Sequence, residues 1–205
     1  MNMKYTSDRN FTDIIHNQVA IPEIYHPLNW RVKTVDKDEL EYVDLNEGID
    51  YFLEDFNGHL ITVQERFREK RYQNFNDCTL RFRRDHHVDA SRHESEFYKI
   101  KADYLVYGII NQNKYDVTSG RIKGSLSFIK YVVVDLKVLQ HKIEEGKIKL
   151  NTQIKRSFIN YRDRTMEAAV LRNHDYSSSF VAFDIKQLYE LFNKDGIILR
   201  QSGFI

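Results

Sequence analysis

The dipeptide Asn57-Gly58 is the feature of this sequence that most constrains the fold, because it separates two apolar runs, residues 51–53 and 60–63. Asn and Gly both tolerate the positive φ that a tight hairpin turn requires, so an antiparallel hairpin is predicted over residues 48–68. Side chains alternate along a strand, which divides the second strand into two faces. One face holds Thr62, Gln64, Arg66 and Arg68, and the other holds Val63, Glu65 and Phe67.

Three polar residues lie at the base of this hairpin: Asp50 opens the first strand, and Gln64 and Arg66 follow on the second. The arrangement resembles the active-site hairpin of the PD-(D/E)xK nuclease superfamily, which has the restriction-endonuclease-like fold. That family places an Asp at the head of one strand and a carboxylate-x-Lys on the next. Asp50 matches the first element, Gln64 stands in place of the acid, as in the Mrr-like branch, and Arg66 stands in place of the Lys. The resemblance covers residues 48–68, with weaker support to about residue 110.

The resemblance implies a nuclease that hydrolyses DNA phosphodiester bonds with Mg²⁺ or Mn²⁺. In that reading Asp50 binds the metal and Gln64 adds a ligand or positions water. Arg66 holds the scissile phosphate, and it cannot act as a base because its pKa stays above about 12. Such a site usually has a third acid, and the sequence does not choose among Glu23, Asp13 and Glu47. We predict a metal site of Asp50, Gln64 and Glu23.

Charge is unevenly distributed along the chain, although the net charge is only +1. Residues 1–60 hold twelve acidic and five basic residues, whereas residues 61–84 hold three acidic and seven basic ones. Residues 121–164 hold four acidic and eleven basic residues, including a basic and aromatic stretch over residues 151–164. This division is typical of a protein with one phosphate-facing side, although Lys and Arg that only solvate exposed faces would also produce it.

The first helix is predicted to begin at Asn10 as its cap and to be limited by Pro22, with one apolar face. A strand over residues 79–83 alternates, so that Arg81 and Arg83 point outward. We expect this strand to pair beside the second hairpin strand, which would join its arginines to Arg66 and Arg68 in one nucleic-acid-binding surface.

A capping box at Ser91 and Glu94 predicts a second helix, on which Lys99 and Lys101 are further candidates for DNA contact. The strand over residues 104–110 is apolar on both faces and is therefore expected at the centre of a sheet. A helix, three strands, a helix and a strand give the αβββαβ order of the family. We therefore expect a single α+β domain over residues 1–205, with a core over 8–112 and an α/β extension over 113–205.

The extension contains a weak internal repeat, residues 131–139 and 180–188. Each copy is an apolar strand that runs into a helix with an Asp, Asp135 or Asp184, at its expected cap. Gly146 and Gly196 then provide the positive φ at which a helix stops.

Other chemistries have less support. Asp85, His86, His87, Asp89 and His93 fit no standard zinc spacing, and the single cysteine, Cys78, is expected to be a small buried residue rather than a nucleophile.

The absence of a long apolar run or a signal-peptide core predicts a cytoplasmic protein without a membrane partner. The sequence does not decide whether the protein forms a homodimer. The alternative function is a non-catalytic nucleic-acid-binding or interaction protein on the same fold, with a lapsed active site.

Overall fold

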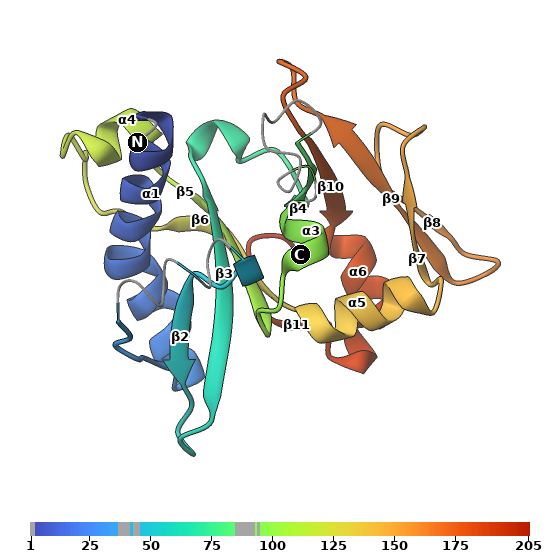
Figure 1. Ribbon diagram of the computed structural model, residues 1–205, viewed down its shortest axis with the longest axis horizontal. Coiled ribbons are helices and arrows are strands. Elements are labelled where there is room, and N and C mark those ends of the chain that lie inside the picture. Colours follow the sequence, from blue (N-terminus) through green and yellow to red (C-terminus); the bar gives the residue numbers. More distant parts are fainter. Residues whose placement is uncertain (1–2, 37–41, 43–45, 85–92, 94) are drawn as a thin grey trace.

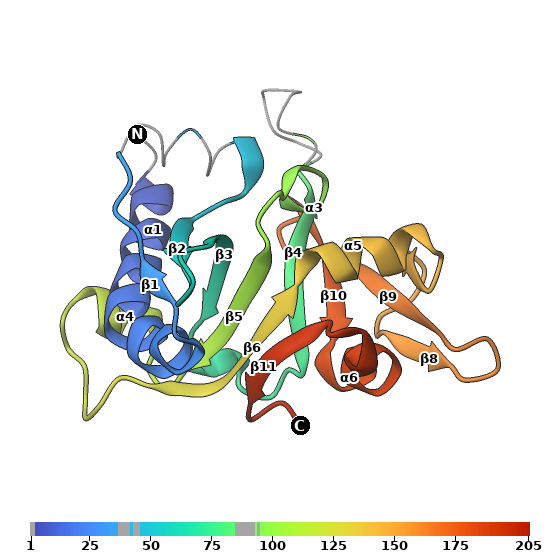
Figure 2. The same cartoon turned by 90° about the horizontal axis from the view of Figure 1, so that it is seen from below.

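The computed structural model describes residues 3–36, 42, 46–84, 93 and 95–205. Its strands form two sheets, the helices α1 and η1 cover one face of the first sheet, and α5 and α6 lie at the junction of the two sheets (Figures 1 and 2). The amino-terminal half contains α1 (Met3–Ile15), η1 (His16–Tyr25), η2 (His26–Leu28), β1 (Arg31–Val32), β2 (Tyr51–Glu54), β3 (Leu60–Arg68), η3 (Lys70–Tyr72), β4 (Asp77–Arg83), α3 (Glu96–Lys99) and β5 (Tyr104–Ile110). The remainder contains α4 (Lys114–Thr118), β6 (Phe128–Asp135), α5 (Leu136–Glu144), β7 (Ile148–Asn151), β8 (Phe158–Asn160), β9 (Thr165–Arg172), β10 (Ser179–Asp184), α6 (Ile185–Phe192), η5 (Asn193–Asp195) and β11 (Ile198–Ser202). The predicted α+β class is confirmed.

The first sheet has the strand order β1-β2-β3-β5-β6-β11. The predicted hairpin is present, with Tyr51 opposite Val63 and Glu54 opposite Leu60. The strand predicted over residues 104–110 is also present and lies between β3, to which it is parallel, and β6, to which it is antiparallel. Its central position explains why both faces are apolar.

The second sheet has the order β4-β10-β9-β7, and β8 pairs with β9. The expectation that β4 pairs beside β3 is wrong: β4 is antiparallel to β10, with Cys78 opposite Phe183. The physical reason is that alternation specifies the faces of a strand and not its partner. Strands from both sides of residue 113 enter each sheet, because β6 and β11 extend the first and β4 opens the second.

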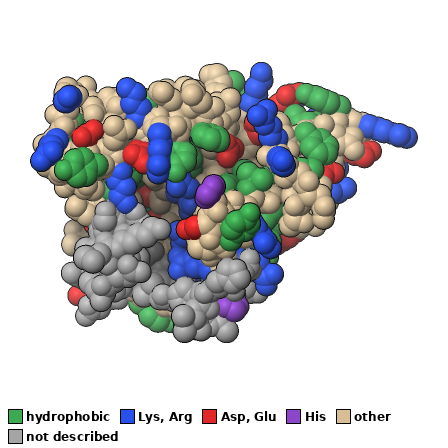
Figure 3. Space-filling view, turned by 90° about the horizontal axis from the view of Figure 1, so that it is seen from above, with side chains coloured by type: hydrophobic (Ala, Val, Ile, Leu, Met, Phe, Trp, Pro, Cys, Tyr) green, Lys and Arg blue, Asp and Glu red, His purple; other side chains and the backbone are tan. Residues whose placement is uncertain are grey.

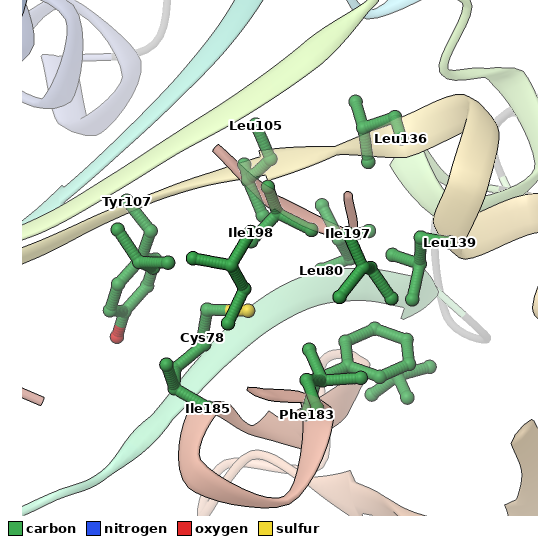
Figure 4. Close-up of a cluster of buried hydrophobic side chains, with 14 of the residues drawn as sticks. Cys78, Leu80, Leu105, Tyr107, Leu136, Leu139, Phe183, Ile185, Ile197 and Ile198 are labelled. Atoms are coloured by element: carbon green, nitrogen blue, oxygen red, sulfur yellow. The ribbon is translucent and has the colours of Figure 1, made fainter. Parts of the chain in front are cut away.

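Two hydrophobic clusters hold these layers. One lies between the first sheet and the α1–η1 helix, and includes Ile15, Val19 and Val63. The other joins the two sheets and the helices α5 and α6, as Figure 4 shows for Leu80, Leu105 and Phe183. Cys78 is fully buried in this second cluster, as predicted, and burial raises the pKa of its thiol.

The first helix differs from its prediction at both ends. It begins near Met3 rather than at Asn10, and it continues as a π-helix from His16 to Tyr25 with Pro22 inside it. Proline disrupts an α-helix because it lacks the N–H and its ring clashes with the carbonyl four residues earlier. The wider π turn changes that spacing, so the helix continues past Pro22. The predicted apolar face is confirmed, with Phe11, Ile15 and Val19 buried.

The internal repeat in the carboxyl-terminal half is confirmed. The Asp135 side chain accepts a hydrogen bond from the Val138 amide at the start of α5, and Asp184 accepts one from Gln187 at the start of α6. Positive φ values at Gly146 and Gly196 follow the two helices. The two copies connect the sheets in opposite senses: the first leads from β6 to β7, and the second leads from β10 to β11.

Candidate functional site

The hairpin β2–β3 holds Asp50 in a fixed position at its open end. The Asp50 amide donates a hydrogen bond of 2.8 Å to the Val63 carbonyl, which continues the ladder one residue beyond β2. At the closed end, the Asp55 carboxylate accepts from the amides of Asn57 and His59. The hydrogen bond from the His59 amide is the main cause of the lowered pKa of Asp55. The turn and the ladder together therefore set where Asp50 lies.

The Asp50 carboxylate is buried, with 6% of the residue exposed, and it is the centre of a polar cluster. Its Oδ2 accepts from the Glu65 amide at 2.7 Å and from Gln64 Nε2 at 2.6 Å. Its Oδ1 lies 3.4 Å from an Arg9 guanidinium nitrogen on α1. A buried carboxylate needs such partners, because removing an unpaired charge from water is costly. Oδ1 makes the longest of these three contacts.

The Gln64 carboxamide lies beside Asp50, as the strand alternation predicted. Its Nε2 donates to Asp50, while its Oε1 is buried and accepts no hydrogen bond from the described residues. Gly48 lies next to this oxygen: its φ is +61°, and any other residue at this position would place its Cβ 3.3 Å from Gln64 Oε1. Gln64 Oε1 is therefore an orphaned acceptor in a confined polar site, a situation that calls for an explanation in a folded protein.

Glu65 lies on the opposite face of β3 and belongs to a cluster that the sequence reasoning missed. Its Oε1 accepts a hydrogen bond from the Tyr25 hydroxyl and lies 2.8 Å from His16 Nδ1. The His16 ring stacks on Tyr51, with centroids 3.6 Å apart. Burial, with the nearby Glu65 as a further cause, raises the pKa values of Tyr25 and Tyr51. A signal was present: Glu65 alternates with Val63 and Phe67, and a charged residue on an apolar face needs a buried partner.

Asp13 is the candidate third acid that the structure brings near Asp50. Its Oδ1 accepts from the Tyr51 hydroxyl at 2.7 Å and lies 3.1 Å from Arg9 Nε. Arg9 thus contacts both carboxylates, Asp13 and Asp50.

Glu23 and Glu47, the other candidate acids, make different contacts. Glu23 Oε2 lies 3.4 Å from the Phe128 amide, at the start of β6, and burial raises its pKa. Phe128 pairs near the far end of β5, about 16 Å along the strands from the level of Asp50 at ~3.3 Å per residue. The structure therefore does not bring Glu23 to the predicted metal set. Glu47 forms an ion pair of 3.0 Å with Lys101, one of the predicted DNA contacts.

The predicted arginine surface is divided between two sheets. Arg66 and Arg68 lie on β3, whereas Arg81 and Arg83 lie on β4, so the four do not alternate on neighbouring strands. Arg68 nevertheless reaches across and donates to Thr79 Oγ1 at 3.3 Å, and its guanidinium lies over the Tyr72 ring.

Basic side chains line a central hollow on one face of the molecule. Figure 3 shows Lys and Arg atoms in this hollow, between the halves that hold the two sheets. Thr79, Arg81 and Arg83 share one face of β4 by alternation, and Arg68 contacts that face through Thr79. Arg68 therefore reaches, from the first sheet, the face of β4 that carries Arg81 and Arg83. Lys99 ends α3, a helix of four residues. The predicted cap of that helix at Ser91 and Glu94, and His86 and His87, lie outside the described residues.

The donor set at Asp50 fits a weakly held Mg²⁺. Hard cations take oxygen ligands, and Mg²⁺ is commonly held by one or two protein side chains, with water and substrate phosphate completing the shell. Asp50 Oδ1 and the orphaned Gln64 Oε1 are suitable donors. For both to reach one cation, the Gln64 side-chain amide must rotate, so that its Nε2 no longer donates to Asp50. Within the described ranges, no three His, Cys, Asp or Glu side chains cluster in a way that could hold a metal ion.

Comparison with protein-family models, with curated proteins and with solved structures finds no match for this chain. No helix among the described residues is long and apolar enough to cross a membrane.

Proposed function

We propose that this protein is a divalent-metal-dependent nuclease that hydrolyses DNA phosphodiester bonds at the base of the β2–β3 hairpin. The observation that carries the proposal is the pairing of Asp50 with Gln64, whose Oε1 is buried without a hydrogen-bond donor. An amide oxygen kept in that state beside a carboxylate is suited to a cation. The element order does not add to this support, because four strands (β1 to β4) precede α3 and β4, the third strand of the predicted αβββαβ order, lies in the second sheet.

Each residue has a distinct role in this proposal. Asp50 and Gln64 would hold Mg²⁺ or Mn²⁺, which supplies polarisation of the phosphate and an activated water when it is bound. Arg66, two residues after Gln64 on the same face, presents a fixed fork of N–H donors that suits phosphate oxygens. The hydrogen bond from the Glu65 amide keeps the Asp50 carboxylate oriented whether or not a ligand is present.

A non-catalytic nucleic-acid-binding protein with a lapsed site is the second candidate. The observation that favours it is the contact of Arg9 with Asp50, because a guanidinium there can satisfy the carboxylate in place of a metal ion. Two further departures from the resembled motif also favour it. Gln64 replaces the acid and so reduces the negative charge available to bind a metal ion, and Arg66 replaces the lysine and so removes the candidate base.

The test compares DNA cleavage in titrations of Mg²⁺ and Mn²⁺ for the parent protein and for Asp50→Ala, with Glu144→Ala as a control at an exposed acid. We expect Asp50→Ala to reduce cleavage by more than about 100-fold, since groups that only orient a metal ligand already contribute about 10–100-fold. Glu144→Ala should cut at the parental rate. An Asp50→Ala protein that also cuts at that rate would remove the proposed site.

A second measurement separates the two candidates without relying on activity. Gln64→Glu adds a charged ligand of the same length, so binding of Mn²⁺, followed by its paramagnetic resonance signal, should tighten. If the parent and Gln64→Glu both bind DNA but neither binds Mn²⁺ nor cuts, the lapsed-site function replaces the nuclease.

A further inference from the structure

A group of basic and aromatic side chains surrounds β8, at the opposite end of the molecule from Asp50. Figure 1 places β8 and its two flanking loops at the right-hand end, while α1 and β2 lie at the left. Residues 151–164 contain four basic residues and one acidic residue. We name as the β8 surface the exposed basic and aromatic members of this segment: Lys155, Arg156, Phe158, Tyr161, Arg162 and Arg164.

The four cations of the β8 surface are not neutralised by any described residue, unlike several cations elsewhere in the molecule. Lys101, Lys137 and Lys142 each form an ion pair with a nearby carboxylate. Within the described part of the chain, no ion pair or side-chain hydrogen bond involves the four cations of the β8 surface. The one local acid, Asp163, accepts a hydrogen bond from Asn160 instead.

Phe158 and Tyr161 add exposed rings among these charges, with 43% and 70% of their surfaces accessible. The nearby Glu190 on α6 raises the pKa of the Tyr161 hydroxyl, so the outer end of this ring lies beside α6. Aromatic rings beside unpaired cations match a single nucleic-acid strand, because bases stack on the rings while phosphates contact the cations.

The backbone beneath this surface is firmly held. β8 pairs with β9, with Phe158 opposite Glu167 and Asn160 opposite Thr165. Ser157 Oγ donates to the Ala182 carbonyl and accepts from the Ala169 amide, which joins the start of the segment to β9 and β10. The Ser157 carbonyl in turn accepts from Gln187 on α6.

These contacts hold the surface in a regular arrangement. β8 is about 10 Å long and lies between the pair Lys155–Arg156 and the turn that carries Arg162 and Arg164. The cations are therefore spaced along a rigid support, and blue side chains project at the same end of the molecule in Figure 3.

We infer that the β8 surface binds a single nucleic-acid strand at a site separate from the Asp50 hairpin. The inference rests on the proposed function for the identity of the partner, and it extends that function by giving the protein two contacts with its substrate. A strand held at both ends of the molecule would stay bound while one end is cut.

The experiment measures binding of a labelled single-stranded 30-mer to the full chain in EDTA, across a salt titration, so that cleavage plays no part. The first variant combines Lys155→Ala, Arg156→Ala, Arg162→Ala and Arg164→Ala. The matched control removes four exposed cations elsewhere, combining Arg31→Ala, Lys33→Ala, Lys123→Ala and Lys194→Ala. Both variants lower the formal net charge from +1 to −3, so a difference in binding between them cannot come from net charge.

The β8 variant should bind at least tenfold more weakly than the control, with a salt slope reduced by about 0.7 for each phosphate that the surface no longer neutralises. A third variant, Phe158→Ala with Tyr161→Ala, should weaken binding without changing the salt slope, since stacking releases no counterions. Equally weakened binding in the β8 variant and its control would overturn the inference. So would a parent protein that binds vesicles containing an anionic phospholipid but not the 30-mer.

The outcome is separable from that of the nuclease test. If the β8 variant no longer binds the 30-mer and the parent never cuts DNA, the β8 surface stands and the nuclease proposal falls. If Asp50→Ala abolishes cleavage and the β8 variant binds like its control, the nuclease proposal stands and the β8 surface falls.

Discussion

The Asp50 hairpin and the β8 surface both concentrate polar and charged residues on a strand pair, but the protein treats them in opposite ways. At the hairpin, Asp50, Gln64 and Glu65 are buried, and neighbouring groups hold most of their polar atoms. At β8 the cations are exposed, and no described residue neutralises them. Burial makes each polar contact expensive to break, whereas exposure leaves charge available for a partner. The first arrangement suits chemistry at a fixed point, and the second suits binding along a surface.

The largest expected effect lies at Glu65. Glu65→Ala removes the acceptor that Tyr25 and His16 share, and both groups are then buried without it. Each orphaned polar group costs about 1–3 kcal/mol, so we expect the free energy of unfolding to fall by about 3 kcal/mol or more. Urea denaturation of the parent and the variant measures this change.

Two control variants test whether the destabilisation comes from the network. Tyr25→Phe deletes one of the two partners and should cost about half as much, while Glu54→Ala, on the neighbouring strand, should change stability by less than about 0.5 kcal/mol. If Glu65→Ala unfolds at the same urea concentration as Glu54→Ala, the buried network does not stabilise the hairpin and the contrast with β8 disappears.

An intermediate effect is expected at Asp184, which caps the helix that supports the β8 segment. Asp184→Ala removes the acceptor for the Gln187 amide and should cost about 1 kcal/mol. Asp184→Asn retains a capping oxygen and should fall within a few tenths of a kcal/mol of the parent. Thermal melting of the three proteins checks the order; indistinguishable melting temperatures for the Ala and Asn variants would argue against the cap.

The smallest effect on stability is expected at the β8 surface itself. Single exposed substitutions usually change stability by less than about 0.5 kcal/mol, so the fourfold Ala variant should be destabilised by less than about 1 kcal/mol in total. The same denaturation experiment serves as the measurement. A destabilisation comparable to that of Glu65→Ala would mean that these cations are structural, which would remove the distinction between the two regions.

Part of the candidate site was predictable because its signals are local. The turn at Asn57-Gly58 and the period-two alternation put Asp50, Gln64 and Arg66 on one hairpin, as predicted. Arg9, His16 and Tyr25 were missed, because they approach the hairpin from a helix 40 or more residues away in the sequence. No pattern within a strand specifies which helix covers it.

The sequence by itself determined the elements whose causes lie within a few residues: the hairpin, the central strand β5, the buried Cys78, and the Asp135 and Asp184 caps with their terminal glycines. Turn chemistry, capping and hydrophobic period act over such short spans, and they are little changed by what packs against them. Tertiary structure alone decided that β4 pairs with β10, that the first helix widens into a π-helix and so continues through Pro22, and that Asp13 rather than Glu23 approaches Asp50. Those outcomes depend on contacts between distant segments, since a strand edge or a helix face can be satisfied by several partners and only the packing of the whole chain selects one.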